Sequence, residues 1–335
     1  MSHRVDTIGP WIVAFFVGAV LAAAVAGVPG RLGAELHDGF LDVLAALTSV
    51  KSWLLIGAIL LAEHFFPARR DQKIMSPNYV LDMFYMFVQG PVMVALAVVF
   101  TAPLRDLLDQ HASWLVLDST RALPALVVVA LGLLLADFIA WCAHVAMHKV
   151  GWLWRFHMIH HAQRELNLFT ANRAHPVDIA FQVVVRFVPL YFFVPSITEQ
   201  AETMLLYALA ITWHIRFQHA NIAFTLGPLR YVFVTPQSHR IHHSLNPEHW
   251  NSNYANVFTC WDRMFGTHNG DTTVRPPTGI ADGGILEPVS YRPDDLARAY
   301  GRQLLFPLSD AAVSAGGVNA SKALLDRRGE GHMPS

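Results

Sequence analysis

The stretch Trp154–His161, WRFHMIHH, places three histidines within five positions of a chain that is otherwise apolar. His157, His160 and His161 are separated by three positions and by one, so that His157 and His161 lie four apart. Spacings of three and four put side chains on one face of an α-helix. The stretch therefore predicts a helix that presents three imidazoles to one side, and imidazole is a common metal ligand.

The same pattern occurs a second time, and a shorter one precedes the first. H-x-x-H-H recurs at His239, His242 and His243, and H-x-x-x-H stands at His144 and His148, at the end of a long apolar run. A single exposed histidine pair is usually a solvated helix face. A pH-sensing or interfacial patch would not need the same spacing twice, so the repetition favours a metal site.

Together with a solitary histidine, these patterns supply nine imidazoles. The set is His144, His148, His157, His160, His161, His219, His239, His242 and His243. Nine imidazoles are too many for one four- to six-coordinate ion, so two metal ions are expected. Imidazole suits iron, zinc, copper and nickel, whereas magnesium and calcium prefer oxygen ligands. The sequence has no H-E-x-x-H motif of zinc peptidases, no Walker A motif, no G-x-S-x-G and no G-x-G-x-x-G.

Three more residues are candidates for supporting roles. His175 and His214 lie between the clusters, and either is a possible additional ligand, although His175 also fits a simple turn before proline. Asp137 precedes His144 by seven residues on the same helical face. It is expected either to accept the outward N–H of a ligating imidazole or to be a buried polar residue bonded elsewhere.

The composition indicates an integral membrane protein. The chain is 53% hydrophobic and only 15% charged, against about 25% charged in ordinary soluble domains. Pro10–Gly30 carries no charge and is long enough to cross a bilayer; a cleaved signal peptide is the alternative. Four to six spans are expected in all. The later candidates are Leu47–Phe66, Tyr79–Leu104, Leu123–Cys142 and a pair between Asp178 and Phe217, which could instead be a hairpin that dips into the membrane or lies on it.

The loops predict the orientation. Pro67–Lys73, PARRDQK, is a short basic connection, which the positive-inside tendency places in the cytoplasm. Alternation of spans then places the histidine clusters and both termini on the cytoplasmic side.

Cys142 and Cys260 are the only cysteines, so no disulfide framework is expected. The net charge is −1 without a basic block, so nucleic acid is not an expected partner.

We therefore expect an all-α membrane helical bundle with a cytoplasmic histidine-rich site for two metals. Residues 1–120 are expected to hold N-terminal transmembrane helices, 121–270 the catalytic domain, and 271–335 a partly disordered cytoplasmic tail. Within the tail, RPDDLARAYGRQLL has Leu296, Tyr300 and Leu304 at four-residue spacing, which predicts a short amphipathic helix.

From Asp137 to Gly266 the chain resembles the fatty acid hydroxylase and sterol desaturase superfamily of membrane di-iron enzymes. The matching words are DFIAWCAHVAMH, WRFHMIHHAQRELNLFTANRAHP, FQHANIAFTLGPLRYVFVTPQSHRIHHS and NYANVFTCWDRMFGT. The resemblance implies that the nine histidines named above bind two iron ions and that O2 is a co-substrate. It also implies a separate electron donor of the cytochrome b5, ferredoxin or reductase type, because no fused cytochrome b5 module is recognised before the first span.

The expected function is oxygen-dependent hydroxylation of a membrane lipid. The resemblance leaves the substrate open among fatty acyl, sterol-like, alkylglycerol and carotenoid-type lipids. A desaturase of the same superfamily is the first alternative, because both reactions begin with removal of a hydrogen from C–H. A catalytically silent metal-binding membrane protein and a dizinc hydrolase are further alternatives, and the absence of acidic residues within the clusters disfavours the hydrolase.

Overall fold

The computed structural model describes residues 38, 41, 45, 49–195, 201–280, 287, 288 and 290–309. In this part of the chain the regular elements are helices, with isolated β-bridges and no strand, so the all-α prediction is confirmed there. The expected first span Pro10–Gly30 and the tail from Ser314 lie outside the described residues. The longer helices are α3 (Val50–Phe65), α4 (Pro77–Phe84), α5 (Gly90–His111), α6 (Ala125–Lys149), α7 (Gly151–His161), α8 (Pro176–Phe193), α10 (Ala201–His219) and α13 (Pro293–Leu305).

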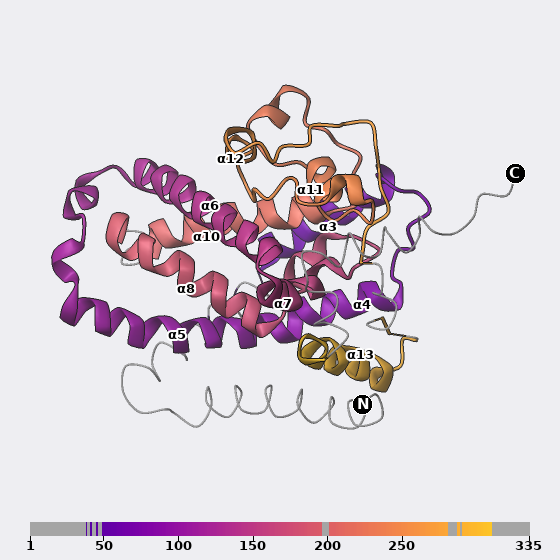
Figure 1. The fold of residues 1–335 in the computed structure, drawn as a ribbon, viewed down its shortest axis with the longest axis horizontal. Coiled ribbons are helices and arrows are strands. Elements are labelled where there is room, and N and C mark those ends of the chain that lie inside the picture. The colour runs from indigo at the N-terminus through magenta and orange to yellow at the C-terminus, as the bar shows by residue number, and fades with distance from the viewer. Residues whose placement is uncertain are drawn as a thin grey trace, which may run out of the picture.

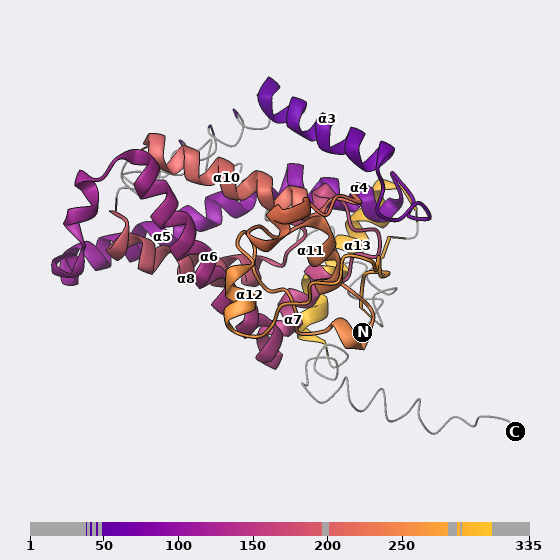
Figure 2. The ribbon, with the colours of Figure 1, turned by 90° about the horizontal axis from the view of Figure 1, so that it is seen from above.

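Four long helices form a bundle that extends to one side of the molecule. Figures 1 and 2 show α5, α6, α8 and α10 running out together, with the shorter helices and loops gathered at the opposite end. Within the bundle α8 packs on both α5 and α6, and α10 packs on α6. We call residues 220–280, which lie at that end, the cap domain, or simply the cap. It contains the short helices α11 (Pro236–His242) and α12 (Cys260–Met264), and α11 packs on α10.

Three of the described helices have the length and apolar composition to cross a membrane. They are Pro77–His111, which joins α4 and α5 through a π-helical turn, Ala125–Lys149 and Pro176–Phe193. Two overlap the spans expected at Tyr79–Leu104 and Leu123–Cys142. The expected pair between 178 and 217 corresponds to α8 and α10, of which α8 meets these criteria. The expected span at 47–66 corresponds to α3, whose 16 residues make a helix of about 24 Å, shorter than a bilayer core of roughly 30 Å.

Local sequence signals explain where the site helices begin. Thr235 and Ser238 form a reciprocal capping box at the start of α11, with Pro236 at the first helical position. His175 plays the same part for α8, because its Nδ1 accepts a hydrogen bond from the backbone N–H of Val177. These caps fix the first turns of two helices that carry side chains of the histidine site.

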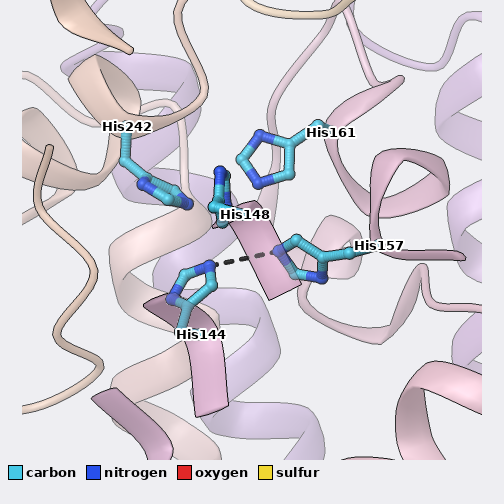
Figure 3. A group of neighbouring side chains, drawn as sticks. All are labelled: His144, His148, His157, His161 and His242. Atoms are coloured by element: carbon cyan, nitrogen blue, oxygen red, sulfur yellow. Dashed lines mark hydrogen bonds between the residues drawn. The ribbon is translucent and has the colours of Figure 1, made fainter. Parts of the chain in front are cut away.

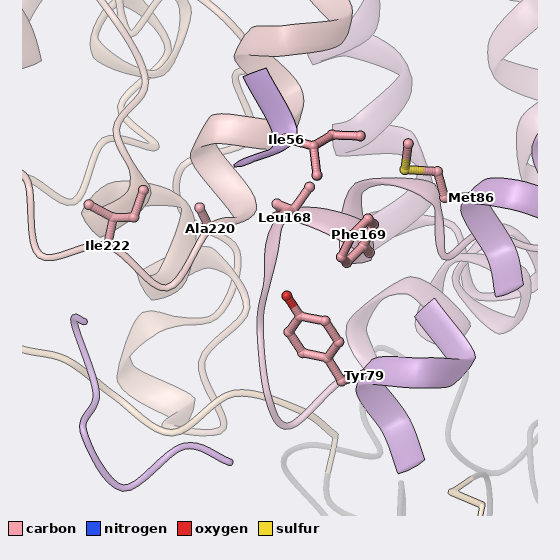
Figure 4. Packing of buried hydrophobic residues seen from close by; sticks show 7 residues of the cluster. All are labelled: Ile56, Tyr79, Met86, Leu168, Phe169, Ala220 and Ile222. Atoms are coloured by element: carbon pink, nitrogen blue, oxygen red, sulfur yellow. The ribbon is translucent and has the colours of Figure 1, made fainter. Parts of the chain in front are cut away.

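An apolar core supports the cap beside α3 and α4. Ile56, Tyr79, Leu168, Phe169 and Ile222 are buried against one another there (Figure 4). Leu168 and Phe169 belong to a 3-10 turn in the loop that follows α7. Burial of these side chains therefore ties that loop to α3 and α4.

The C-terminal amphipathic helix is confirmed as α13. Tyr300 and Leu304 are buried against Leu81 and Tyr85, and Leu296 packs on the same cluster. The hydroxyl of Tyr85 also donates to Oε1 of Gln303 over 2.6 Å. The apolar stripe of α13 therefore packs on α4 and the turn after it.

Candidate metal centre

The structure brings all nine predicted histidines together, in two groups. The first group is His144, His148, His157, His161 and His242, shown in Figure 3, and the second is His160, His219, His239 and His243. Within each group one ligand nitrogen from every residue lies within 4.8 Å of the others. Among the described residues, no other set of three or more histidine, cysteine or acidic side chains converges in this way.

The first group takes side chains from three helices. His144 and His148 lie one turn apart near the end of α6, so their rings face the same way. The Nε2 atoms of His144 and His157 are 3.1 Å apart, and the His242 ring from α11 lies 4.5 Å from the His144 ring between centroids. The ring of His161 completes the group, 4.7 Å from that of His148. Figure 3 shows these rings converging from different sides.

The second group is smaller and also draws on three helices. Nε2 of His219, the last residue of α10, lies 3.1 Å from Nε2 of His160 and 2.9 Å from Nε2 of His239. His243 follows α11, and its Nε2 lies 3.1 Å from that of His239. Four Nε2 atoms therefore point into one small space.

Each H-x-x-H-H cluster is divided between the two groups. In α7, the i,i+4 pair His157 and His161 joins the first group, and His160 joins the second. In α11 the division is reversed, because the i,i+4 pair His239 and His243 joins the second group and His242 joins the first. Each H-x-x-H-H pattern thus contributes histidines to both groups.

The two groups are direct neighbours. The ring of His161 in the first group stacks on that of His243 in the second, with centroids 4.3 Å apart and an interplanar angle of 23°. His160 and His161 are adjacent in sequence and belong to different groups. Ions held in the two groups would therefore share one interior space.

Backbone carbonyls hold several of these rings from behind. In each case Nδ1 donates the hydrogen bond, which turns Nε2 toward the group and fixes the ring orientation. The pairs are His144 with Tyr254 O (2.7 Å), His160 with Arg173 O (2.9 Å), His219 with Ile215 O (2.7 Å) and His242 with Ser252 O (2.8 Å). Because main-chain carbonyls carry no sequence signature, residue patterns could not identify these partners.

One carboxylate contacts the histidines. Oδ2 of Asp178 accepts a hydrogen bond from Nδ1 of His157 over 2.9 Å, and both side chains are buried. Asp178 lies in the first turn of α8, where an acidic side chain is favoured by the helix dipole. This role was not predicted from the sequence, because the acidic residue in HPVD fits a helix start without any reference to His157.

Of the two roles expected for Asp137, the structure shows the second: it is a buried polar residue bonded elsewhere and not the partner of an imidazole. Its carboxylate accepts hydrogen bonds from the backbone N–H groups of Val257 and Phe258 and from Nε1 of Trp261, at 2.8 to 3.0 Å. A separation of seven residues keeps the helical face but puts Asp137 about 10 Å along the axis from His144, too far for direct contact. Asp137 instead fastens the segment after Tyr254 to α6.

The two histidines considered as additional ligands, His175 and His214, lie outside both groups. His175 uses both ring nitrogens elsewhere, since Nδ1 caps α8 and Nε2 donates to the carbonyl of Leu304 over 3.0 Å. His214 lies on α10 with its ring 6.1 Å from that of Phe233. The structure therefore does not bring a tenth imidazole into either group.

Several nitrogens of the nine histidines are buried without a hydrogen-bond partner. They are Nε2 of His148, His161 and His242, which belong to the first group, and Nδ1 of His239 and His243, whose Nε2 atoms face into the second group. Buried polar atoms are normally satisfied, so the three orphaned Nε2 atoms of the first group call for a ligand. For a neutral imidazole with an unprotonated nitrogen, a metal ion is the natural partner.

Burial favours the neutral form of five imidazoles in or directly after α7 and α11. It lowers the pKa of His160 to about 4 and that of His242 to about 3. Burial, together with the neighbouring histidines, holds the pKa of His161, His239 and His243 well below the usual value. Neutral imidazole is the form that binds metal, so the interior favours the required protonation state at neutral pH.

A buried ion pair lies directly behind the second group. Nε of Arg173 donates to Oδ1 of Asp82 over 2.5 Å, and neither side chain is exposed. Asp82 also accepts hydrogen bonds from three polar side chains of the loop after α7, namely Gln163, Asn167 and Thr170. Because the carbonyl of Arg173 orients His160, this network connects α4 to the histidine site.

Comparison with known proteins agrees with this geometry. Residues 129–267 match the family model described as fatty acid hydroxylase, which confirms the resemblance seen in the sequence. An aligned part of 42% of the chain is 33% identical to an alkylglycerol monooxygenase of Caenorhabditis elegans. A part of the same share is 35% identical to the ornithine lipid hydroxylase OlsE of Rhizobium tropici. Over 40% of the chain, it is 30% identical to a cholesterol 25-hydroxylase-like protein of Danio rerio.

These matches cover the histidine region and not whole proteins. The aligned part accounts for 27% of the Caenorhabditis protein, 42% of the Rhizobium protein and 53% of the Danio protein. The chain therefore spans less than two thirds of the length of each of these relatives. No solved structure matches it significantly.

Proposed function

We propose that this protein is an oxygen-dependent, di-iron hydroxylase of a membrane lipid. The observation that carries the proposal is the convergence of nine imidazoles into two adjacent groups inside a helical bundle. The family match at residues 129–267 supports the reaction class, because the printed names of the relatives are hydroxylases and monooxygenases. These names favour hydroxylation over the desaturase reaction.

The residues fit two transition-metal ions. The first group offers five imidazoles and the second four, with nitrogens already directed inward and several lacking any other partner. A ligand set made only of imidazoles suits iron, zinc, copper or nickel and disfavours magnesium and calcium. The first group would hold one ion and the second group the other. Iron is the choice that fits hydroxylation, because bound iron supplies the activation of O2.

The protein contributes placement and exclusion of water. Asp178 and the carbonyls behind the rings fix which nitrogen of each imidazole faces inward. Burial of the rings keeps bulk water from the reacting atoms. Insertion of one oxygen atom into C–H releases the other as water and consumes two electrons and two protons. We therefore propose a separate electron-donor protein of the cytochrome b5, ferredoxin or reductase type.

The membrane setting supports a lipid substrate. His144 and His148 lie near the end of α6, one of the three helices apolar enough to span a bilayer. A lipid chain that moves between such helices would reach the first group without crossing water. The relatives are named for alkylglycerol, ornithine lipid and cholesterol, which share only their lipid character. The substrate class proposed here is accordingly a membrane lipid with an unactivated C–H bond.

Lipid analysis under oxygen-18 gas tests this function. Cells that express the iron-supplied protein with a reductant should accumulate a lipid heavier by one oxygen, and that oxygen should carry the label. His157→Ala should abolish the product, whereas His111→Ala, at an exposed position at the end of α5, should leave it unchanged. Loss of two hydrogens without label would show a desaturase. No new lipid with wild-type protein would show a silent metal-binding protein and overturn the proposal.

A further inference from the structure

Two neighbouring segments of the cap expose apolar side chains and carry two arginines. Leu229, Tyr231 and Val232 are each about half exposed, and Met264 and Phe265 are exposed on the adjacent helix end. Arg230 and Arg263 lie among them. We call residues 229–232 and 263–265 together the lip. Contiguous exposed apolar side chains of this kind mark a surface that another phase or molecule covers.

Hydrogen bonds join the two segments of the lip. The backbone N–H of Thr259 donates to the carbonyl of Val232 over 3.0 Å, and its Oγ1 donates to the carbonyl of Tyr231 over 2.9 Å. Thr259 immediately precedes α12, whose end carries Arg263 and Met264. The lip is therefore one fixed surface made from two parts of the chain.

The lip lies beside the apolar part of α6. The ring of Phe265 stacks on that of Trp141 at 4.5 Å, and Trp261 donates to Asp137 over 3.0 Å. α12 is seen next to α6 in Figures 1 and 2. Asp137 is two turns, about 10 Å, from His144 toward the apolar half of the helix. The lip thus extends from the level of the histidines along the flank of a candidate membrane span.

Exposed apolar side chains continue from the lip along α6. Leu134 and Leu131 lie one and two turns further toward its N-terminus, and both are more than 40% exposed. This continuity between the lip and a candidate membrane span points to the bilayer as what covers the lip. If a bilayer surrounds the exposed leucines of α6, its headgroup layer lies at the height of the lip.

The two arginines are arranged for anionic headgroups. The guanidinium carbons of Arg230 and Arg263 lie 4.6 and 4.9 Å from the centre of the Tyr231 ring. Beside them is a cavity of about 240 Å³ whose walls include Ser238 and His268. Two arginines, Arg230 and Arg263, and one acidic residue, Asp271, line this cavity, so its charged side chains are mainly positive. Tyrosine and arginine side by side are typical of the membrane–water interface.

We propose that the lip lies in the headgroup layer of the bilayer and that Arg230 and Arg263 bind the phosphate of anionic phospholipids. The apolar side chains enter the boundary of the acyl region, and Tyr231 holds both guanidinium groups at headgroup height. The proposal requires α6 to be in the membrane and does not depend on the metals or on hydroxylation. It would anchor the cap, which carries α11 and its histidines, against the end of α6.

The first test measures the depth of the lip. Cys142 and Cys260 are replaced by serine, and single spin labels are attached at Met264→Cys and, as a control, at Glu248→Cys, an exposed position in the cap. The protein is placed in nanodiscs of phosphatidylcholine and phosphatidylglycerol. The label at 264 should be more accessible to oxygen than to a water-soluble nickel complex, and the label at 248 should behave in the opposite way. Equal nickel accessibility at both positions would overturn the proposal.

The second test measures lipid preference. The immobilised fraction of spin-labelled phosphatidylglycerol is compared with that of spin-labelled phosphatidylcholine. Because each basic side chain near an anionic surface is worth about fivefold in association, the preference should fall at least fivefold in Arg230→Gln with Arg263→Gln. The matched control Arg292→Gln with Arg298→Gln, at the N-cap and in the second turn of α13, should keep it.

Two further arms identify the ligand. Arg230→Lys with Arg263→Lys should restore the preference for phosphatidylglycerol, because the charge is retained. Millimolar inorganic phosphate should not compete with the lipid if the surface is built for a bilayer. Unchanged preference in the glutamine variant, or full competition by phosphate, would overturn binding of lipid headgroups at the lip.

Discussion

Asp178 supports His157 from the side opposite to the first group: Oδ2 of the carboxylate is 2.9 Å from Nδ1 of the ring, while Nε2 of the same ring is 3.1 Å from Nε2 of His144. Gln182, one turn along α8, donates to the other carboxylate oxygen over 2.8 Å. The carboxylate is thereby held in place before it orients the imidazole. Carboxylates in this position raise the basicity of a ligating ring and fix its orientation.

Asp178→Asn should weaken metal binding without unfolding the protein. Loss of such a partner typically costs about 10- to 100-fold in metal affinity. Competition with a chelator, on purified protein in detergent, measures the change. Asp118→Asn, at an exposed turn before α6, is the control and should keep the wild-type affinity. Equal affinity in all three proteins would show that Asp178 does not support a ligand.

The two groups should bind one ion each. We expect metal analysis after iron-supplemented growth to find close to two transition-metal ions per chain, although zinc competes with ferrous iron for nitrogen ligands. His242→Ala removes a member of the first group and His160→Ala a member of the second, so each should lose most of one ion. A single ion in the wild type, with neither variant changing the content, would contradict two separate sites.

The buried pair of Asp82 and Arg173 should be important for stability. Asp82→Ala leaves the guanidinium of Arg173 buried without its carboxylate, which costs about 3 to 5 kcal/mol. Denaturation of the detergent-solubilised protein should therefore begin at a clearly lower temperature or denaturant concentration. Asp294→Ala, at an exposed ion pair of α13, should change little. The prediction fails if the two variants are equally stable.

Acid should destabilise the metal-free protein. In the unfolded chain histidine titrates near pH 6.5, whereas burial lowers the pKa of His160 to about 4 and that of His242 to about 3. As the pH falls from 6.5 toward 4, the unfolded state binds protons that the folded state does not, so stability decreases. Each such group contributes about 1.4 kcal/mol per pH unit once its unfolded form is protonated. Thermal denaturation of chelator-treated protein at pH 7.5 and pH 5 measures this. A midpoint that does not fall in acid would contradict neutral burial.

Both histidine clusters should face the cytoplasm, as the basic loop 67–73 predicts. Single cysteines at Arg164 and Asn246, each in a background without Cys142 and Cys260, report the side of the membrane. In intact cells an impermeant thiol reagent should leave both positions unlabelled, and it should label them after the membrane is opened. Labelling from outside at either position would reverse the proposed orientation.

The sequence was most informative where function depends on short-range spacing. Three and four positions along a helix determine which side of the helix a residue occupies, so eight of the nine histidines were predicted from their spacing. The solitary His219 was added without a spacing partner, and all nine converge. The division of His157 and His160 between different groups was not predictable. It depends on tertiary structure, which brings His219 to His160 and His242 to His161.

The contacts of Asp137 and Asp178 also could not be predicted from spacing along the sequence. Asp137 shares a helical face with His144, but angular position says nothing about a distance of two turns along the axis, and the residue bonds the 257–261 segment instead. Asp178 has no spacing relation to His157 at all. It reaches that ring because α8 packs on both α6 and α7. Contacts between helices that are distant in sequence leave no local pattern.

The reversed division of the two H-x-x-H-H clusters also bears on biosynthesis. The first group is incomplete until His242 arrives, and the second needs His160 from a helix made long before His239 and His243. A nascent chain that has completed α7 therefore cannot close either group. Both groups would be completed in one step, when α11 docks. A chain truncated before α11 would lack one imidazole of the first group and two of the second, so late synthesis of the cap would set the moment at which both groups become complete.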